Sequence, residues 1–382
     1  ADFSLKTAAQ LGLNRNEAAA YDAVIAHFRR NENLEEAITG ITDADAFGAF
    51  YGQLLPHHGD GTMRQLSGLA DMATGAVGQH LQIVNAGGRR GGDGWAQQFG
   101  DYRKQDGSTQ TDRVSGTSYG LATGYDAPAG LIDALGVYGQ MSFTSVHEKP
   151  VLLPGRVTPS TDEVRAESFA IGAYLSDRIG PLSLEVNAAY GSVTFDSVRG
   201  VNFNGISDVV RGSWHGTSTT ASARLTYPIL DFGHLLRAEA GIDHFALEQD
   251  GYRERTGNTS LDLGLAMQVG RAESDMTSHF IGLRGGYRSG GGTPAEIVWE
   301  PNYYIGYRSV ADTTAYAADA NFIDSSSDTL RLTGLVEAGD SGDFGRGVAA
   351  HNDFFAFELP YRGKIGDDEE MHGGGISIRL LF

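Results

Sequence analysis

The stretch Leu182-Ser183-Leu184-Glu185-Val186-Asn187-Ala188-Ala189-Tyr190 decides the fold. Apolar and mostly polar residues alternate along it, which is typical of a β-strand with one apolar and one polar face. The alternation recurs from Gly94 to the last residue, and an even number of such strands suits a closed antiparallel barrel. We expect about twelve strands, near residues 94–107, 114–128, 133–148, 163–178, 181–200, 206–229, 233–251, 277–289, 295–310, 327–338, 352–364 and 373–382.

Two features favour an all-β transmembrane barrel over a soluble β-fold. Many of these segments exceed ten residues, whereas strands of soluble proteins usually have about five or six. Tyr and Trp recur near the strand ends, as in the aromatic girdles of outer-membrane barrels. Such a barrel turns its apolar faces to lipid and its polar faces to a lumen. The residues that this pattern predicts to face the lumen are Glu185, Arg224, Arg237, Glu239, Asp243, Glu300, Arg308, Arg331, Glu337, Glu358 and Arg362.

Residues 1 to about 86 have a different pattern, which predicts helices. Asn14 and Glu17 have the spacing of a capping box at a helix start. A later segment, 62–85, lacks proline and is rich in glycine and alanine, but its charged and polar residues exclude contact with lipid. We therefore expect it to form a helix that is shielded from lipid by polar surroundings, and its charged and polar side chains are Arg64, Asp71, His80 and Gln82. Two shorter helical segments are expected at 34–41 and 44–55.

Composition excludes several classes of protein. The 382 residues carry a net charge of −19, which argues against nucleic-acid binding through a basic surface. No stretch approaches the roughly 18 apolar residues of a membrane-spanning helix. Because there is no cysteine, thiol catalysis and cysteine-based zinc sites are excluded. The first residues lack the features of an export signal, so any such signal is expected upstream.

The remaining candidate sites are interpreted as structural. The sequence Gly339-Asp340-Ser341 is similar to an esterase motif but lies in a glycine-rich, polar stretch, and Asn85 is read as a helix end rather than a self-cleaving residue. His57 and His58 are read as an exposed loop, and the acidic run 367–370 as a solvated one. We therefore predict no enzymatic activity, no cofactor and no metal site.

Connections and the C-terminal end fit the barrel interpretation. Tight turns are expected at 179–181 and 231–233, and long polar loops elsewhere, which is the asymmetry of outer-membrane barrels. The last segment alternates again and stops at an aromatic residue. Its apolar positions are Ile376, Ile378, Leu380 and Phe382.

At this point the chain resembles the translocator domain of the classical monomeric autotransporters, the type Va secretion system of Gram-negative bacteria. The resemblance spans nearly all of the chain, although no single motif is specific. It rests on the order of Leu11-Gly12-Leu13-Asn14-Arg15-Asn16, residues 47–56, Arg64-Gln65-Leu66-Ser67, Gly94-Trp95-Ala96-Gln97-Gln98-Phe99-Gly100, Gly120-Leu121-Ala122-Thr123-Gly124-Tyr125-Asp126 and the final Phe382.

The resemblance implies an outer-membrane translocator that anchors an N-terminal passenger and assists its export to the cell surface. It implies a helical passenger-proximal linker or stalk at 1–61, a pore helix with a glycine-rich turn at 62–92, and a twelve-stranded barrel at 93–382. The N-terminal segment would lie at the cell surface. The implied partners are lipid and lipopolysaccharide, periplasmic chaperones, and the barrel-insertion machinery, which would read the last strand.

Two other functions remain open from the sequence. A passive twelve-stranded porin or nutrient channel would usually fold a loop, rather than a helix, into its lumen. An outer-membrane hydrolase would need a His and a Ser on the lipid-facing side of adjacent strands. His244 is the nearest candidate for that histidine, and the alternation supplies no clear serine partner.

Overall fold

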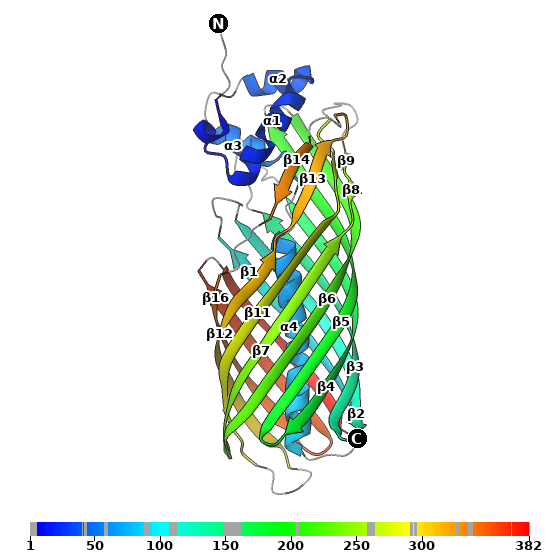
Figure 1. The fold of residues 1–382 in the computed structure, drawn as a ribbon, viewed down its shortest axis with the longest axis vertical. Coiled ribbons are helices and arrows are strands. Elements are labelled where there is room, and N and C mark those ends of the chain that lie inside the picture. The colour runs from blue at the N-terminus through cyan, green and yellow to red at the C-terminus, as the bar shows by residue number, and fades with distance from the viewer. Residues whose placement is uncertain are drawn as a thin grey trace.

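A computed structural model describes residues 6–39, 41, 44–56, 60–87, 92–106, 113–148, 162–203, 206–257, 264–290, 293, 296–325, 329–334, 339–367 and 369–381. The chain forms a tall barrel around one long helix, with three shorter helices at one end (Figure 1).

Twelve long strands make the wall within these residues. They are β1 (Asp93–Gln105), β2 (Val114–Ala129), β3 (Ile132–Glu148), β4 (Glu163–Ile179), β5 (Leu182–Phe203), β6 (Ile206–Phe232), β7 (His234–Gln249), β11 (Ala272–Tyr287), β12 (Val298–Thr314), β15 (Ser341–His351), β16 (Phe355–Gly366) and β17 (Glu369–Leu381). Each strand pairs antiparallel with its neighbours, β1 with β17 and β5 with β6, so the sheet closes on itself. The closed twelve-stranded antiparallel barrel predicted from the alternation is confirmed.

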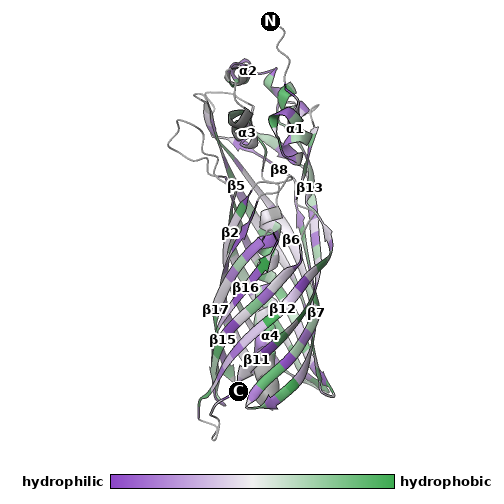
Figure 2. Ribbon diagram, turned by 90° about the vertical axis from the view of Figure 1, so that its left-hand side faces the viewer, coloured by the Kyte–Doolittle hydropathy of each residue, from purple (hydrophilic) through white to green (hydrophobic). Residues whose placement is uncertain are grey.

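The alternation separates an outer apolar face from an inner polar one. On β2, Tyr119 and Leu121 are exposed, whereas Ser118 and Asp126 are buried. Large apolar side chains are also exposed on strands far from β2, as Ile305 is. Figure 2 shows the result as alternating hydrophobic and hydrophilic bands along the strands. A barrel that exposes such an apolar surface is built to contact lipid.

The two ends of the barrel differ. At one end, which we call the turn end, very short connections carry Gly130, Gly180 and Gly233 at φ of 63°, 65° and 77°. Residues with side chains rarely adopt this left-handed conformation, so glycine makes these tight turns possible. The C-terminus lies at the turn end and the N-terminus at the opposite end, which we call the loop end (Figure 1).

One predicted wall strand is wrong. Residues 327–338 were expected in the barrel, but β14 (Thr329–Thr333) belongs to a separate small sheet at the loop end. The position between β12 and β16 is taken by β15, which begins in the stretch expected to be a polar loop. Leu330 and Leu332 have the alternation of lipid-facing residues, but both are buried against protein.

The helices follow the predicted order. A short 3-10 helix η1 (Ala8–Leu11) precedes α1 (Arg15–Phe28), α2 (Glu32–Thr39), α3 (Ala44–Gly52) and α4 (Asp60–Gly87). The capping box is present, because Asn14 accepts a hydrogen bond from the Glu17 N–H at 2.9 Å and Glu17 accepts one from the Asn14 N–H at 2.8 Å. Among the described helices, none combines the length and the apolar character needed to cross a bilayer.

A second sheet stands on the loop end. It consists of β8 (Tyr252–Arg253), β10 (Met267–Val269), β13 (Ala317–Phe322) and β14, in the order β14-β13-β10-β8, and we call it the platform. Strand β9 (Arg255–Thr256) pairs with β6 beside it. Helices α1–α3, which we call the cap, pack on the platform and share its apolar core.

Candidate functional site

Helix α4 runs through the barrel (Figure 1), and its small residues allow the wall to approach it closely. A Cβ atom on Gly68 would lie 2.3 Å from a guanidinium nitrogen of Arg103, and one on Gly75 would lie 2.2 Å from one of Arg362. Contacts shorter than 3.0 Å require something to move, and at both positions the atom that would have to move is the end of an arginine side chain. The glycine-rich sequence of α4 therefore allows long wall side chains to lie directly against the helix backbone.

One side of α4 packs against β1, β2 and β3. Gln65 donates hydrogen bonds to Asp101 at 2.9 Å and to Ser118 at 2.7 Å, near the loop end of the helix. In its middle, Thr74 accepts a hydrogen bond from Asn187 of β5 at 3.0 Å. These polar contacts fix the helix against one wall.

His80 anchors the turn end of α4. Its Nε2 atom contacts Asp126, and neither side chain is exposed by more than 2 %. Asp126 also accepts a hydrogen bond from the Tyr174 hydroxyl at 2.7 Å, and this hydroxyl accepts one from the Trp95 indole at 2.8 Å. The ring of Trp95 stacks on His80, with centroids 5.7 Å apart. The network joins the helix to β1, β2 and β4.

A carboxylate near the loop end of the lumen gathers three cations. Glu369 lies 3.2 Å from Arg64 of α4, 3.0 Å from Arg103 and 3.4 Å from Lys364. Glu369 is in the acidic run that the sequence reading placed in a solvated loop, but here it starts β17 and is almost fully buried. That interpretation is wrong for this residue, because a run of charges does not show which of its members a strand turns inward.

The middle of the lumen contains a second cluster, centred on Arg308. Arg308 lies 2.7 Å from Asp243, 3.1 Å from Asp343 and 4.0 Å from Asp71 of α4. Below it, Arg284 and Glu239 approach to 2.6 Å. Buried ions need such partners because they leave water on folding.

Most of the predicted lumen residues lie in or beside these clusters. Nine of them, together with Arg64, Asp71 and His80 of α4, lie at the inner surface of the barrel: Glu185, Arg224, Arg237, Glu239, Asp243, Glu300, Arg308, Glu358 and Arg362. Arg331 does not, because it is on β14, where its side chain is 65 % exposed and lies 3.6 Å from Asp319. Glu337 and the side chain of Gln82 lie outside the described residues.

The other candidates have ordinary surroundings. Ile376, Ile378 and Leu380 are exposed on the outer face of β17, and Phe382 lies outside the described residues. His244 forms a hydrogen bond with the Thr277 hydroxyl at 2.9 Å, so its partner is not a serine. Residues 57–59 and the side chain of Asn85 also lie outside the description.

Arg199 locks the cap to the barrel. It is 2 % exposed and donates hydrogen bonds to the backbone carbonyls of Gln53 and Leu54, both at 2.9 Å, just after α3. The second terminal nitrogen of its guanidinium, Nη2, contacts Glu254 at 2.6 Å and donates a hydrogen bond to the Leu265 carbonyl at 3.3 Å. One side chain of β5 therefore holds both the cap and the segments that lead into the platform.

The cap and platform share a core of apolar and aromatic side chains. His27 of α1 stacks on Phe322 of β13 with ring centroids 3.9 Å apart, and Phe28 stacks on Phe50 at 5.9 Å. Tyr51 is fully buried and donates a hydrogen bond to the Glu17 carbonyl at 2.9 Å. Burial raises the pKa of Tyr51 well above its ordinary value, and the nearby carboxylate of Glu17 adds to this; burial likewise raises the pKa of Tyr252 in the platform.

Sequence reasoning missed several residues that hold the lumen and the cap together. Arg103, Arg284 and Arg379 are on predicted strands and on the polar side of the alternation, so the same rule could have found them. Arg199 is on the same side of the predicted strand 181–200 as Glu185, but its partner Glu254 had no such signal, because their contact depends on segments that fold back over the barrel. Within the described residues, no group of three or more His, Asp or Glu side chains could hold a metal ion.

A model of one protein family matches most of the chain. It is described as the autotransporter β-domain and covers residues 94–355. No curated protein matches the chain.

Three similar solved structures are translocators. The translocator domain of the autotransporter NalP from Neisseria meningitidis is 14 % identical, with a TM-score of 0.59 over 85 % of this chain and 100 % of that one. The β-domain of the Bordetella autotransporter BrkA is 16 % identical, with a TM-score of 0.51 over 76 % and 99 %. The transport unit of AIDA-I from Escherichia coli is 11 % identical, with a TM-score of 0.50 over 81 % and 99 %. At these identities the matches show a common fold.

Proposed function

The chain belongs to the autotransporter β-domain family, and from this premise we propose that the loop end faces the outside of the cell and that α4 is the segment left in the pore after export. The protein is an outer-membrane translocator that anchors an N-terminal passenger and assists its export to the cell surface. It acts as an anchor and a conduit, not as an enzyme.

The path of the chain carries this proposal. The cap lies at the loop end, α4 passes through the lumen, and β1 begins at the turn end (Figure 1). A chain with this path has crossed the barrel once, from the turn end outward. Residues 1–61 then form the passenger-proximal stalk, 62–92 the pore helix with its turn, and 93–382 the translocator barrel.

The lumen suits the passage of an extended polypeptide. Many of its charged wall side chains pair with one another or with α4, so a passing segment would meet polar groups as well as apolar surface. The passenger's C-terminal end would occupy the pore as a hairpin, and α4 would close it afterwards. Contacts such as Thr74 with Asn187 would then hold the plug in place.

The outer surface and the last strand suggest further partners. Lipid and lipopolysaccharide would cover the exposed apolar belt, and the barrel-insertion machinery and periplasmic chaperones would read β17. Its outward apolar side chains Ile376, Ile378 and Leu380 form one stripe on the last strand.

A labelling experiment tests the orientation, and the absence of cysteine makes it clean. Ala18 is exposed on α1, and Leu131 is 98 % exposed in a turn at the turn end. In intact cells, a membrane-impermeant maleimide should label Ala18→Cys but not Leu131→Cys, which should react only after the outer membrane is permeabilised. The reverse pattern would refute the orientation.

A reporter fusion tests export. A reporter fused before Ala1, behind a signal peptide, should appear on the cell surface by whole-cell antibody binding. The matched control is the same reporter fused before Gly92, where β1 begins at the turn end, and it should remain in the periplasm. Surface display of the control, or none of the full-length fusion, would contradict the translocator mechanism.

A further inference from the structure

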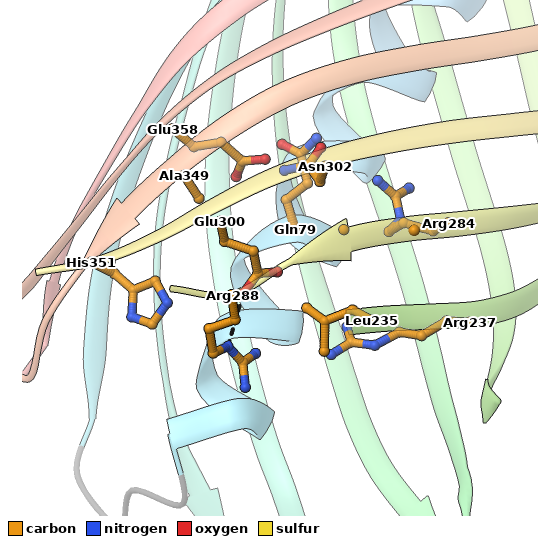
Figure 3. A pocket seen from close by; sticks show the side chains of 12 residues that line it. Gln79, Leu235, Arg237, Arg284, Arg288, Glu300, Asn302, Ala349, His351 and Glu358 are labelled. Atoms are coloured by element: carbon orange, nitrogen blue, oxygen red, sulfur yellow. Dashed lines mark hydrogen bonds and ion pairs between the residues drawn. The ribbon is translucent and has the colours of Figure 1, made fainter. Parts of the chain in front are cut away.

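Helix α4 does not fill the lumen evenly. It packs against β1, β2 and β3, and the opposite side of the lumen, formed by β7, β11, β12, β15 and β16, keeps cavities beside the helix. The lower cavity, near the turn end, has a volume of about 40 Å³ and includes Gln79 and Arg284 among its lining residues (Figure 3). The middle cavity has about 80 Å³ and the upper one about 110 Å³.

These cavities follow one another along the helix. Gln79, Arg284 and Asn302 line both the lower and the middle cavity. Arg103 and Lys364 line both the middle and the upper one. A water molecule needs about 10–15 Å³ of such space, so each cavity has room for several in a polar lining. The hollow side of α4 is therefore a wet track from the turn end toward the loop end.

The track is basic although the protein is acidic overall, with a net charge of −19. In the lower cavity Arg237, Arg284 and Arg288 face Glu300 and Glu358. The middle cavity has the largest excess, with six basic side chains of the lumen face against three carboxylates: Asp71, Glu239 and Asp343. The upper cavity has three basic side chains against two carboxylates, Asp367 and Glu369.

Two of the arginines in the middle cavity have no ion-pair partner among the residues that the structure describes. Arg362 lies directly against Gly75 of α4, and Arg224 lies against Gly78 and over the ring of Phe280, 5.1 Å from its centroid. Arg346, by contrast, is exposed on the outer face of β15, opposite Tyr303 and Tyr361. The guanidinium groups of Arg224 and Arg362 line the cavity without an ion pair.

We propose that this track binds and conducts small inorganic anions of the chloride class while α4 is in place, which makes the closed translocator a weak, anion-selective leak. Rings of Arg or Lys select anions in pores, and low-dielectric walls focus their potential on the space between them. The unpaired arginines supply the selectivity, and the uneven seating of α4 supplies the path. The inference concerns the resting protein and does not depend on its export activity.

Reversal potentials in planar bilayers test the proposal. The purified full chain is measured in a KCl gradient, and the wild type should pass a small current with a chloride-to-potassium permeability ratio above one. Arg224→Gln and Arg362→Gln should each lower the ratio, and the two changes should accumulate in the double variant. A wild type that is silent, unselective or cation-selective would overturn the proposal, as would variants with the wild-type ratio.

Two control variants separate charge from structure. Arg331→Gln removes a positive charge from the exposed face of β14, away from the track, and should leave the ratio unchanged. Arg362→Lys keeps the charge and should retain most of the selectivity lost in Arg362→Gln. Heat-modifiable electrophoretic mobility confirms that each barrel is folded. If Arg362→Lys loses as much selectivity as Arg362→Gln, the charge of this residue is not the cause and the proposal fails.

Discussion

Helix α4 and the cap both close the barrel, but they are held by different chemistry. Buried polar contacts fix α4 to the wall alongside its apolar side chains, such as those of Gln65 with Asp101 and of His80 with Asp126. The cap is held by a shared apolar core with stacked rings, as His27 on Phe322, and by the single buried cation Arg199. One closure lies inside a polar lumen and the other stands on a folded sheet.

This difference explains why each closure suits its place. Polar contacts in a lumen can be exchanged for water, so a helix held by them can enter a pore that earlier carried an extended chain. An apolar core gains free energy only where the unfolded chain was exposed to water, at about 25 cal/mol per Å² of buried apolar area. The cap therefore gains this free energy only where helices α1–α3 can pack on the platform in contact with water.

The largest expected effect separates the two closures by conductance. A chain that starts at Gly92 lacks both α4 and the cap, whereas one that starts at Asp60 lacks only the cap. The first should show a severalfold higher single-channel conductance than the full chain, because the lumen of the barrel is then empty of its helix. The second should stay close to the full chain. Planar bilayer recordings of the three proteins make the comparison.

An equally open channel in the chain that starts at Asp60 would mean that the cap, not α4, is the main closure. Unchanged conductance in the chain that starts at Gly92 would count against α4 as a plug.

Arg199 should be the most sensitive single residue of the cap. Arg199→Met removes the partner of Glu254 and leaves this carboxylate buried, along with two carbonyls after α3. Breaking a buried ion pair in this way costs about 3–5 kcal/mol. We expect limited proteolysis to cut α1–α3 quickly in the variant while the barrel stays intact. Arg165→Met, on the exposed face of neighbouring β4, is the control and should resemble the wild type.

Comparison of the two regions also shows what the sequence could predict. Most of the wall follows from periodicity, because a strand facing lipid must alternate, and the charged residues of α4 exclude contact with lipid. The place of α4 in the lumen came from the family resemblance. The platform was not predicted, because Leu330 and Leu332 of β14 alternate with Arg331 in the same way as a wall strand. The period-2 pattern shows that one face is apolar, but not whether lipid or protein covers it.

Strand β15 shows the opposite failure. Its first half, Ser341-Gly342-Asp343-Phe344-Gly345-Arg346-Gly347, is glycine-rich and charged and was read as a loop. It pairs with β12 on one side and β16 on the other, so backbone hydrogen bonds to both neighbours override its weak local preference. The ion pairs were equally hidden, since Arg308 meets Asp243 and Asp343 from 65 and 35 residues away.

A smaller effect tests the hydrogen bonds between cap and platform. Asn16 is 1 % exposed and forms three hydrogen bonds with Thr333 of β14. The Asn16 side chain accepts hydrogen bonds from the Thr333 N–H at 3.0 Å and from the Thr333 hydroxyl at 2.7 Å, and it donates one to the Thr333 carbonyl at 2.5 Å. Asn16→Ala leaves these groups unpaired and should destabilise docking by about 1–3 kcal/mol for each buried group that finds no water. Proteolysis rates across a urea series measure the loss. Ala19→Ser, on the exposed side of α1, should change nothing, and equal rates for the two variants would contradict the docking geometry.

Replacement of Tyr51 should have the smallest effect at neutral pH, yet the buried hydroxyl of Tyr51 should make the cap sensitive to alkali. Its pKa is raised in the folded protein above the value of about 10 in an unfolded chain. A group with a raised folded pKa stabilises the fold fully below its unfolded pKa, and this contribution is lost as pH rises above about 10. The cap should therefore become sensitive to protease above pH 10, in step with tyrosinate absorbance, while α4, whose contacts with the wall do not involve Tyr51, stays in the lumen. Tyr51→Phe should lose only one hydrogen bond at neutral pH and should make the cap less sensitive to alkali, although buried phenols such as Tyr21 and Tyr252 remain. An alkaline transition that is identical in Tyr51→Phe and the wild type would show that the burial of this hydroxyl does not control the stability of the cap.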